Sequence, residues 1–437
     1  MKQQLIGVTF LAGISQIAAL AKTWIVARQF GVGPDLDGYN LAFTAPAVIV
    51  GVISGSIQIG LFPICSQLRQ ESGEVATVRI ERMVLVGVTA LALLISLLLF
   101  AVNGLVGGWI ARDATVGVVS ATIFAMKFAS AAVVLNVAGD LLGYQLAMRG
   151  KFMIAAAAPI ANVVVSSAML LAWPTLGLLN LVAGTTVGLA LQVSIVALGA
   201  HVHGIRLFGD LPSRAEFTPA ARRILGLSVW MFPALLFSNV TNALPPMLLT
   251  RFGDGAVSAF GYAFRIHQSI VQLLVMAAAP VILARFSDLV ARKEWATLDR
   301  LQRKALLAAA VIGLTAVVAV WVLGAPLLKL VFGNGRFDDI AVARVAKHWL
   351  CLTFGLGTAI FGNVLAKRIQ ASGGAPTLAL LSFVGTAVLV LVTIAMRGVA
   401  GESSVSLALT LSSAVLTIAM LIAIRAYDPN KSHISST

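Results

Sequence analysis

Runs of about twenty apolar residues recur along almost the whole 437-residue chain, and this recurrence limits its possible folds more than any other feature. A helix of about that length crosses the hydrocarbon core of a bilayer. Hydrophobic residues make up 59% of the chain, charged residues make up 11%, and the mean hydropathy is +0.96. These values lie outside the range of soluble globular proteins. The sequence therefore predicts an all-α polytopic membrane protein.

We expect twelve transmembrane helices, separated by short connections that leave no room for a separate soluble domain. Their predicted centres lie near residues 16, 50, 94, 130, 163, 193, 238, 271, 317, 354, 387 and 414.

The basic residues are distributed unevenly between alternate connections. Twenty Lys and Arg residues fall on one side, and four fall on the other, namely Arg112, Arg251, Arg336 and Arg397. Because cytoplasmic connections carry the excess of basic residues, this asymmetry predicts that both termini are cytoplasmic. The net charge of +14 is then explained by topology and contact with anionic lipids, so we expect no nucleic-acid partner.

The chain divides into two similar halves. The longest basic connection among the central loops predicts an N-terminal six-helix half (1–205), a basic cytoplasmic connection (206–225) and a C-terminal six-helix half (226–437). The pattern Arg28-Gln-Phe-Gly-Val-Gly recurs as Arg251-Phe-Gly-Asp-Gly, and each copy is followed by a Tyr and an Ala-Phe pair. Two parallel repeats around a central cavity would explain this pattern, although two membrane hairpins can also resemble each other by chance.

Two cations lie well inside apolar segments. Lys22 is in the run 5–27, and Arg265 is in the run 256–283. A cation within the hydrocarbon layer costs roughly 2.5–3.5 kcal/mol on the insertion scales, so it normally faces a bundle interior with a partner or a substrate. Their placement predicts a transporter that holds an anionic group inside the membrane.

Arg265 belongs to a polar helix face. Gln268, Ser269 and Gln272 follow it at the i+3, i+4 and i+7 positions. In the preceding span, polar residues 238–242, including Asn242, come before a Pro-Pro pair that should break or kink the helix. The two segments are typical of a wall of a hydrated cavity, and hydrogen bonding between helices is the alternative.

In the first half, Asp37 opens the second span, where it either caps the helix or acts in function. Arg28 ends the first span and is placed to snorkel towards the membrane surface. Lys127 and Asp140 share the fourth span, about 20 Å apart along the axis, and so cannot pair directly. Asp140 is a candidate proton or cation site, or else a structural partner for another helix.

The tenth span begins with Arg344, Lys347 and His348. We expect these side chains to snorkel, and receiving an anionic group is the alternative. Cys65 and Cys351 are far apart and form no metal or redox motif, so no cofactor is expected. The chain has no phosphate-binding loop and no nucleophile or metalloprotease motif, which argues against an ATP-driven pump or an enzyme.

The stretch 15–74, with Ile-Val-Ala-Arg-Gln-Phe-Gly-Val-Gly, Asp37, Ala-Phe, Pro46 and Phe-Pro, resembles the MviN/MurJ family of lipid II flippases. Tyr262-Ala-Phe-Arg-Ile-x-Gln268, the stretch 326–337 and Ser-Gly-Gly-Ala-Pro-Thr at 372–377 also match. The family belongs to a superfamily that includes polysaccharide flippases and multidrug exporters. The resemblance implies a cation-lined cavity between two six-helix halves that receives the head of a polyprenyl-diphosphate lipid.

Residue by residue, the resemblance matches Lys22 and Arg265 to cavity arginines of the family and Asp37 to a family aspartate. We expect the substrate-binding set to be Lys22, Asp37, Lys127, Arg265, Gln268 and Gln272. The candidates for coupling or gating are Arg28, Asp140 and Asn242.

The sequence also departs from the family pattern. Gln16 replaces a family Arg, and Val50 and Gly55 replace a family Arg and Glu. Family members usually have fourteen spans, and we expect twelve here. The loss of these cavity charges should change headgroup selectivity, so a polyprenyl-linked glycan other than the peptidoglycan precursor becomes more plausible.

The resulting prediction is a monomeric inner-membrane flippase for a lipid-linked anionic saccharide, working by alternating access. Its expected partners are that lipid and the bulk membrane lipids, with glycan-assembly enzymes as further candidates. The coupling ion is not identified by the sequence. The alternatives are a cation-coupled multidrug exporter, which would use Asp140, and a transport-inactive scaffold for envelope assembly.

Overall fold

A computed structural model describes residues 2–205, 209–210, 212, 214–276, 282, 285–286, 288–290, 292, 294–333, 335–371 and 375–426. Within these ranges the chain forms helices and no strand, so the predicted all-α class is confirmed. Eight described helices are long and apolar enough to cross a membrane, or nine if one bent pair counts as a single span. The predicted number of twelve and the cytoplasmic position of both termini stay predictions.

The chain forms two compact units. The first comprises 1–239, 253–258 and 335–337, and the second comprises 240–252, 259–334 and 338–437. The predicted division at 206–225 stays a prediction. Part of that connection lies outside the described residues, and helix α9 already begins at Arg214.

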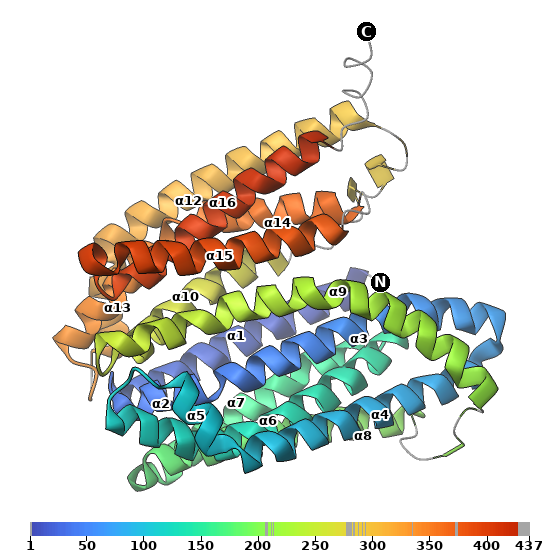
Figure 1. The fold of residues 1–437 in the computed structure, drawn as a ribbon, viewed down its shortest axis with the longest axis horizontal. Coiled ribbons are helices and arrows are strands. Elements are labelled where there is room, and N and C mark those ends of the chain that lie inside the picture. Colours follow the sequence, from blue (N-terminus) through green and yellow to red (C-terminus); the bar gives the residue numbers. More distant parts are fainter. Residues whose placement is uncertain are drawn as a thin grey trace. The chain divides into compact units, whose positions relative to one another are not determined.

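The helices of the first unit run side by side in Figure 1. They are α1 (Lys2–Phe30), α2 (Pro34–Ala42), α3 (Thr44–Glu71), α4 (Gly73–Ala101), α5 (Asn103–Ile110), α6 (Val116–Met148), α7 (Phe152–Ala172), the 3-10 turn η1 (Pro174–Leu176), α8 (Leu178–Val202) and the first part of α9 (Arg214–Leu249).

Helix α6 is the centre of the first unit, because it packs against α2, α3, α4, α5, α7 and α8. Its buried residues are mostly Ala, Val and Leu and lie on several sides of the helix. A helix that is apolar all round belongs in the interior of a bundle.

The second unit contains the last part of α9, the 3-10 turn η2 (Thr250–Phe252), most of α10 (Ala256–Met276), α12 (Trp295–Phe332), α13 (Asp339–Thr353), α14 (Leu356–Ala371), α15 (Ala375–Ala400) and α16 (Ser403–Ala426). Helix α16 packs against α13, α14 and α15. A core that includes Phe361, Leu365, Leu381 and Ile424 fills the space between them.

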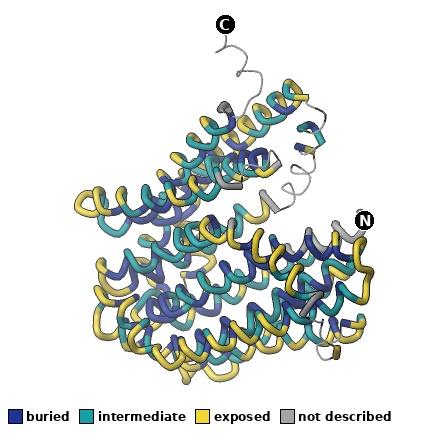
Figure 2. Tube along the Cα trace, turned by 45° about the vertical axis from the view of Figure 1, so that its right-hand side comes forward, coloured by how far each residue is buried: buried dark blue, intermediate teal, exposed yellow. Residues whose placement is uncertain are grey.

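Exposed leucines cover the outward sides of several helices. Leu94 and Leu97 of α4 are 54% and 58% exposed, and Leu314 and Leu330 of α12 are 70% and 77% exposed. Figure 2 shows the same arrangement, with exposed residues on the outward sides of the helices and buried residues between them. Apolar surface of this extent is stable only against lipid, in agreement with a multi-pass membrane protein.

The junction of α13 and α14 shows how freed backbone groups are satisfied at a break between helices. Helices α13 and α14 meet at 42°, at the position predicted as the centre of the tenth span. There the Thr410 hydroxyl donates to the Cys351 carbonyl at 2.7 Å. The Pro245-Pro246 pair does not break α9, which stays helical to Leu249, and the predicted kink stays a prediction. Each proline removes one bond to the preceding turn, which a long membrane helix tolerates when neighbouring groups receive the freed carbonyls.

Candidate functional site

Lys22 is part of a hydrogen-bonded group inside the first unit. Its Nζ, on α1, donates to the Thr185 hydroxyl of α8 at 3.3 Å. Thr185 uses its own proton on the Leu181 carbonyl, so the Tyr39 hydroxyl of α2 donates to Thr185 at 3.2 Å. Lys22 is half-buried, whereas Thr185 and Tyr39 are buried. A cation at membrane depth thus has polar neighbours on two other helices and remains partly accessible.

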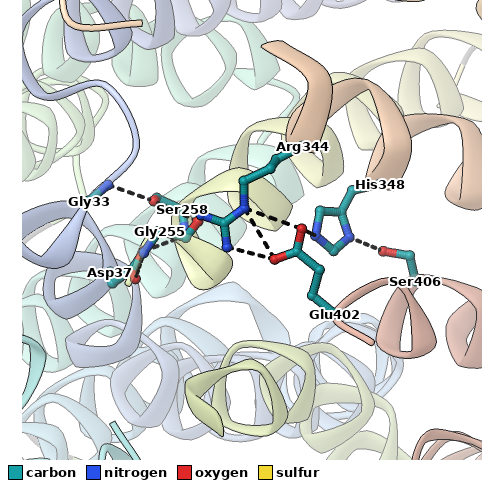
Figure 3. A network of polar contacts seen from close by, with 8 residues as sticks. All are labelled: Gly33, Asp37, Gly255, Ser258, Arg344, His348, Glu402 and Ser406. Carbon is teal, nitrogen blue, oxygen red and sulfur yellow. Dashed lines mark hydrogen bonds and ion pairs between the residues drawn. The ribbon is translucent and has the colours of Figure 1, made fainter. Parts of the chain in front are cut away.

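Asp37 binds the start of α10. Its side chain is 1% exposed, and its two carboxylate oxygens accept the backbone N–H groups of Gly255 and Ser258, each at 2.6 Å. Helix N-termini have unpaired N–H groups and partial positive charge, and both favour a carboxylate. Asp37 therefore caps α10 rather than its own helix as predicted, and its role in function stays a prediction (Figure 3).

The loops that the sequence repeat pairs with each other are bonded reciprocally within the first unit. Asp37 accepts hydrogen bonds from two amides at the start of α10. In return, the Gly33 amide before α2 donates to the Ser258 hydroxyl at 3.3 Å. Gly31, with φ +60°, lies against the Arg336 carbonyl, and the Arg336 amide donates to the Arg28 carbonyl at 3.1 Å. Any side chain at Gly31 would strain the backbone and collide with Arg336.

Arg28 itself is exposed, with its guanidinium 5.7 Å from the centre of the Trp24 ring. This contact is a cation–π interaction with a neighbour on the same helix. Lys127 is also exposed, on α6, and Asp140 is half-buried on the same helix. The structure therefore brings together Lys22 with Tyr39 and Asp37 with the start of α10. It gives no such contact for Lys127.

The second unit contains an open cavity of about 340 Å³ between α9, α10, the α13–α14 pair and α16. Two predicted residues, Asn242 and Gln268, line it. Arg265 lies on the same face of α10 as Gln268, one turn earlier, and is half-buried. Arg265 and Gln272 are not among the lining residues, and Gln272 is exposed.

The polar residues of α9 divide between the two predicted roles. Asn242 faces the cavity, as a hydrated wall requires. Thr241 instead shares a hydrogen bond of 2.6 Å with Thr386 of α15, which is hydrogen bonding between helices. Both of the alternatives raised for this segment are therefore represented, each by different residues.

Sequence reasoning missed a polar cluster at the start of α16 (Figure 3). Arg344 of α13 forms a two-armed ion pair with Glu402, with its NH2 and Nε groups 2.6 Å and 3.2 Å from Oε2. His348 is fully buried, with Nδ1 2.7 Å from the Ser406 hydroxyl and Nε2 3.8 Å from Glu402 Oε1. Arg344 and His348 therefore do not snorkel as expected, whereas Lys347 is exposed.

The pKa of Glu402 reflects two opposing effects. Burial of the carboxyl would raise its pKa, but the hydrogen bonds and charge of Arg344 outweigh burial and hold the pKa below its usual range. The sequence signal for this pair is the acid Glu402, which stands isolated between two late spans. It lies 58 residues from Arg344. Nothing local in the sequence links the two positions.

A second missed cluster lies in the first unit. Glu81 of α4 is 1% exposed and accepts from Arg149 at 2.7 Å and from Arg69 at 3.3 Å. The Gln145 amide of α6 also donates to the Glu81 carbonyl at 3.1 Å. In the sequence, Arg69 and Arg149 indicate only topology, and nothing local identifies their shared partner.

One departure from the family pattern has a steric reason. A Cβ on Gly55 of α3 would lie 3.1 Å from the Leu235 side chain of α9, and Gly51, one turn earlier, lies against Asn239. Helices α3 and α9 therefore pack closely through glycines, and a glutamate at position 55 would need this contact to open. Gln16 and Val50, the other two departures, are both half-buried.

Comparison with known proteins gives a consistent result. The family model described as "Lipid II flippase MurJ" matches residues 26–435. The lipid II flippase MurJ of Burkholderia cenocepacia is 26% identical over 81% of this chain and 69% of its own length. The probable lipid II flippase MurJ of Rhizobium tropici is 24% identical over 82% of this chain and 67% of its own.

Two solved structures share the fold. A lipid II flippase MurJ in an inward closed conformation aligns with a TM-score of 0.81 and 15% identity, covering 96% of this chain and 87% of that one. An inward-facing multidrug transporter of the MATE family aligns with a TM-score of 0.76 and 15% identity, covering 96% and 94%. At this identity the structural likeness shows the fold alone.

Proposed function

Because the chain belongs to the lipid II flippase MurJ family, we propose that it moves a polyprenyl-diphosphate-linked saccharide, lipid II or a related lipid-linked glycan, across the inner membrane. The observation that carries the proposal is the family match, which runs from residue 26 to residue 435. Membership of this family makes the chain a multi-pass membrane transporter rather than an enzyme.

Lys22 and Arg265 bind the diphosphate. Each is a half-buried cation in an apolar segment, and one lies in each unit. Charge-assisted hydrogen bonds to phosphate oxygens are about twice as strong as neutral ones, and they offset the cost of a cation at membrane depth. Thr185 and Tyr39 support this role by orienting the Lys22 ammonium.

Asp37 acts as a gate that holds the start of α10. Its two bonds to the Gly255 and Ser258 amides must break if this end of the molecule opens during alternating access. Backbone amides hold the carboxylate. The closed arrangement is therefore independent of the side chains that line the cavity.

Both termini face the cytoplasm, and the twelve helices form two parallel repeats. The energy comes from the membrane potential or an ion gradient, since each elementary charge moved across the membrane contributes about 2.3 kcal/mol per 100 mV. Glycan-assembly enzymes that make the lipid-linked substrate are the expected functional partners. A monomer is sufficient for the mechanism.

The test is transport of fluorescent lipid II in vesicles that contain the purified protein. Lys22→Ala and Arg265→Ala should each lower the initial rate at least tenfold, because each removes one diphosphate contact. Lys22→Arg and Arg265→Lys should retain most of the rate. Arg397→Ala removes an exposed cation at the end of α15 and should change nothing.

Undiminished transport in both alanine variants would refute the assigned roles. Native mass spectrometry of the gently purified protein provides an independent check on the substrate class. A bound polyprenyl diphosphate carrying sugars is the expected result. Ordinary phospholipid alone, unchanged when polyprenyl diphosphate is added, would instead favour an exporter or a scaffold.

A further inference from the structure

We infer that the cavity of the second unit binds the saccharide part of the transported lipid, an inference that rests on the proposed function. The ligand class is an uncharged, hydroxyl-rich group linked to the diphosphate that Arg265 holds. Four observations carry this assignment: the chemistry of the lining, the direction of its hydrogen bonds, its size and its position beside Arg265.

The lining combines apolar surface with polar groups that carry no permanent charge. Among the described lining residues there is no Asp, Glu, Lys or Arg. The polar side chains are hydroxyls, carboxamides and one imidazole, from Thr241, Asn242, His267, Gln268, Thr358, Asn363, Thr410, Ser412, Ser413 and Thr417. The aromatic ring of Phe264 and several aliphatic side chains complete the wall. Apolar surface with a few placed polar groups is typical of sites for small uncharged molecules.

Several lining groups use their protons on nearby helix carbonyls. Thr410 donates to Cys351 at 2.7 Å, Ser412 to Gly385 at 2.8 Å and Thr417 to Thr358 at 3.0 Å. The Asn363 amide likewise donates to the Ala359 carbonyl at 2.9 Å. A hydroxyl that donates in this way still has lone pairs, so these residues offer acceptors to the cavity. Sugar hydroxyls are the matching donors.

The same chemistry disfavours charged ligands. An anion needs donors or cations around it, and the hydroxyls of Thr410, Ser412 and Thr417 have spent their protons on helix carbonyls. A hard cation is normally bound with carboxylate ligands, which the described lining lacks. A neutral polyol loses little when it leaves water for such a site, because each of its hydroxyls finds an acceptor.

Size and position fit one part of a larger head. At about 340 Å³ the cavity is near the lower end of small-molecule pockets, which span roughly 300–1,000 Å³. It has room for part of a saccharide and not for a whole lipid. Gln268 lines the cavity three residues after Arg265, a rise of about 4.5 Å along α10. A diphosphate held by Arg265 would therefore present its first sugar to this cavity.

The test compares two lipids on the full-length protein in detergent: undecaprenyl diphosphate and the same lipid carrying its disaccharide, as in lipid II. Binding of each is measured by native mass spectrometry or thermophoresis. The wild type should prefer the sugar-bearing lipid. The double variant Thr358→Val, Asn363→Leu removes two cavity acceptors and should lose roughly tenfold of that preference, while its affinity for undecaprenyl diphosphate stays unchanged.

Two control variants separate binding from folding. Thr358→Ser with Asn363→Gln keeps both acceptors and should restore the preference. Thr393→Val removes a buried hydroxyl that also donates to a helix carbonyl, Leu389 at 2.7 Å, but does not line the cavity. It should leave the preference intact.

The possible outcomes distinguish this inference from the proposed function. If the wild type flips lipid II but binds both lipids equally, or if the double variant keeps its preference, the sugar site is refuted and the flippase stands. If the double variant instead alters only the sodium dependence of transport, the cavity is a cation site and the inference is wrong. If the wild type neither binds nor flips either lipid, both proposals fail.

Discussion

In the described part of each unit a glutamate with little exposure connects helices, and the two glutamates are held differently. Glu81 in the first unit is 1% exposed and accepts from two arginines, Arg69 and Arg149. The Glu402 side chain in the second unit is 18% exposed and pairs with one arginine, Arg344, beside the fully buried His348. The first cluster thus joins α3, α4 and the end of α6, whereas the second joins α13 to the start of α16.

The difference in solvent exposure determines how strongly each glutamate–arginine contact is screened. Glu81 is almost completely shielded from solvent, so its pairs with Arg69 and Arg149 are screened only weakly. Glu402 is partly exposed, so solvent screens its pair with Arg344 more strongly. Losing one partner should therefore cost more stability in the first unit than in the second.

The largest effect is expected for Glu81→Gln. It removes the buried carboxylate that two partly exposed arginines share, and removing one partner of a buried pair costs about 3–5 kcal/mol. Thermal unfolding of the purified protein in detergent should show a midpoint clearly below that of the wild type. An unchanged midpoint would mean that water, rather than Glu81, stabilises these arginines.

Glu402→Gln should destabilise the protein less, by about 1–3 kcal/mol, the usual range for a hydrogen bond to a charged group. The pair is partly exposed, so solvent screens Arg344 once its partner is lost. Arg344→Lys keeps the charge but not the two-armed geometry. Its stability should lie between that of Glu402→Gln and that of the wild type. If Glu402→Gln proved more damaging than Glu81→Gln, the ranking by burial would be wrong.

The pH dependence of stability separates the two glutamates further. The pKa of Glu402 in the folded protein is lowered, so its stabilising effect is fully present above the unfolded value of about 4.3 and is lost as pH falls through the folded value. The stability difference between the wild type and Glu402→Gln should therefore be constant from neutral pH down to about 5 and shrink below about 4. A difference that persisted undiminished at pH 3 would contradict this account.

The smallest effect is expected for Arg223→Ala, which removes the exposed pair with Glu71. Their atoms approach to 3.0 Å, as closely as several buried contacts, but both side chains are about half exposed. Surface pairs of this kind contribute about 0–1 kcal/mol. The midpoint of thermal unfolding should barely move, and a large shift would show that short distance, not burial, sets the strength of these contacts.

Much of the fold and part of the candidate site followed from sequence patterns. Apolar runs identify helices because the bilayer sets their length, and the i, i+3, i+4 spacing placed Arg265 and Gln268 on one face of α10. The same reasoning placed Asn242 near Gln268, and both line one cavity. It misjudged Arg344 and His348, since a basic residue near the end of a span looks the same whether it snorkels or meets a buried acid.

The sequence by itself determined the class of protein, the positions of Lys22 and Arg265 within apolar helices, and the repeat that pairs the loops around Gly31 and Gly253. Only the tertiary structure decided which groups these residues meet. Asp37 reads as a cap for its own helix and instead caps α10, more than 200 residues later, and Arg149 meets Glu81 across 68 residues. Helical periodicity is a local property of the chain, whereas such partners depend on which helix faces pack together.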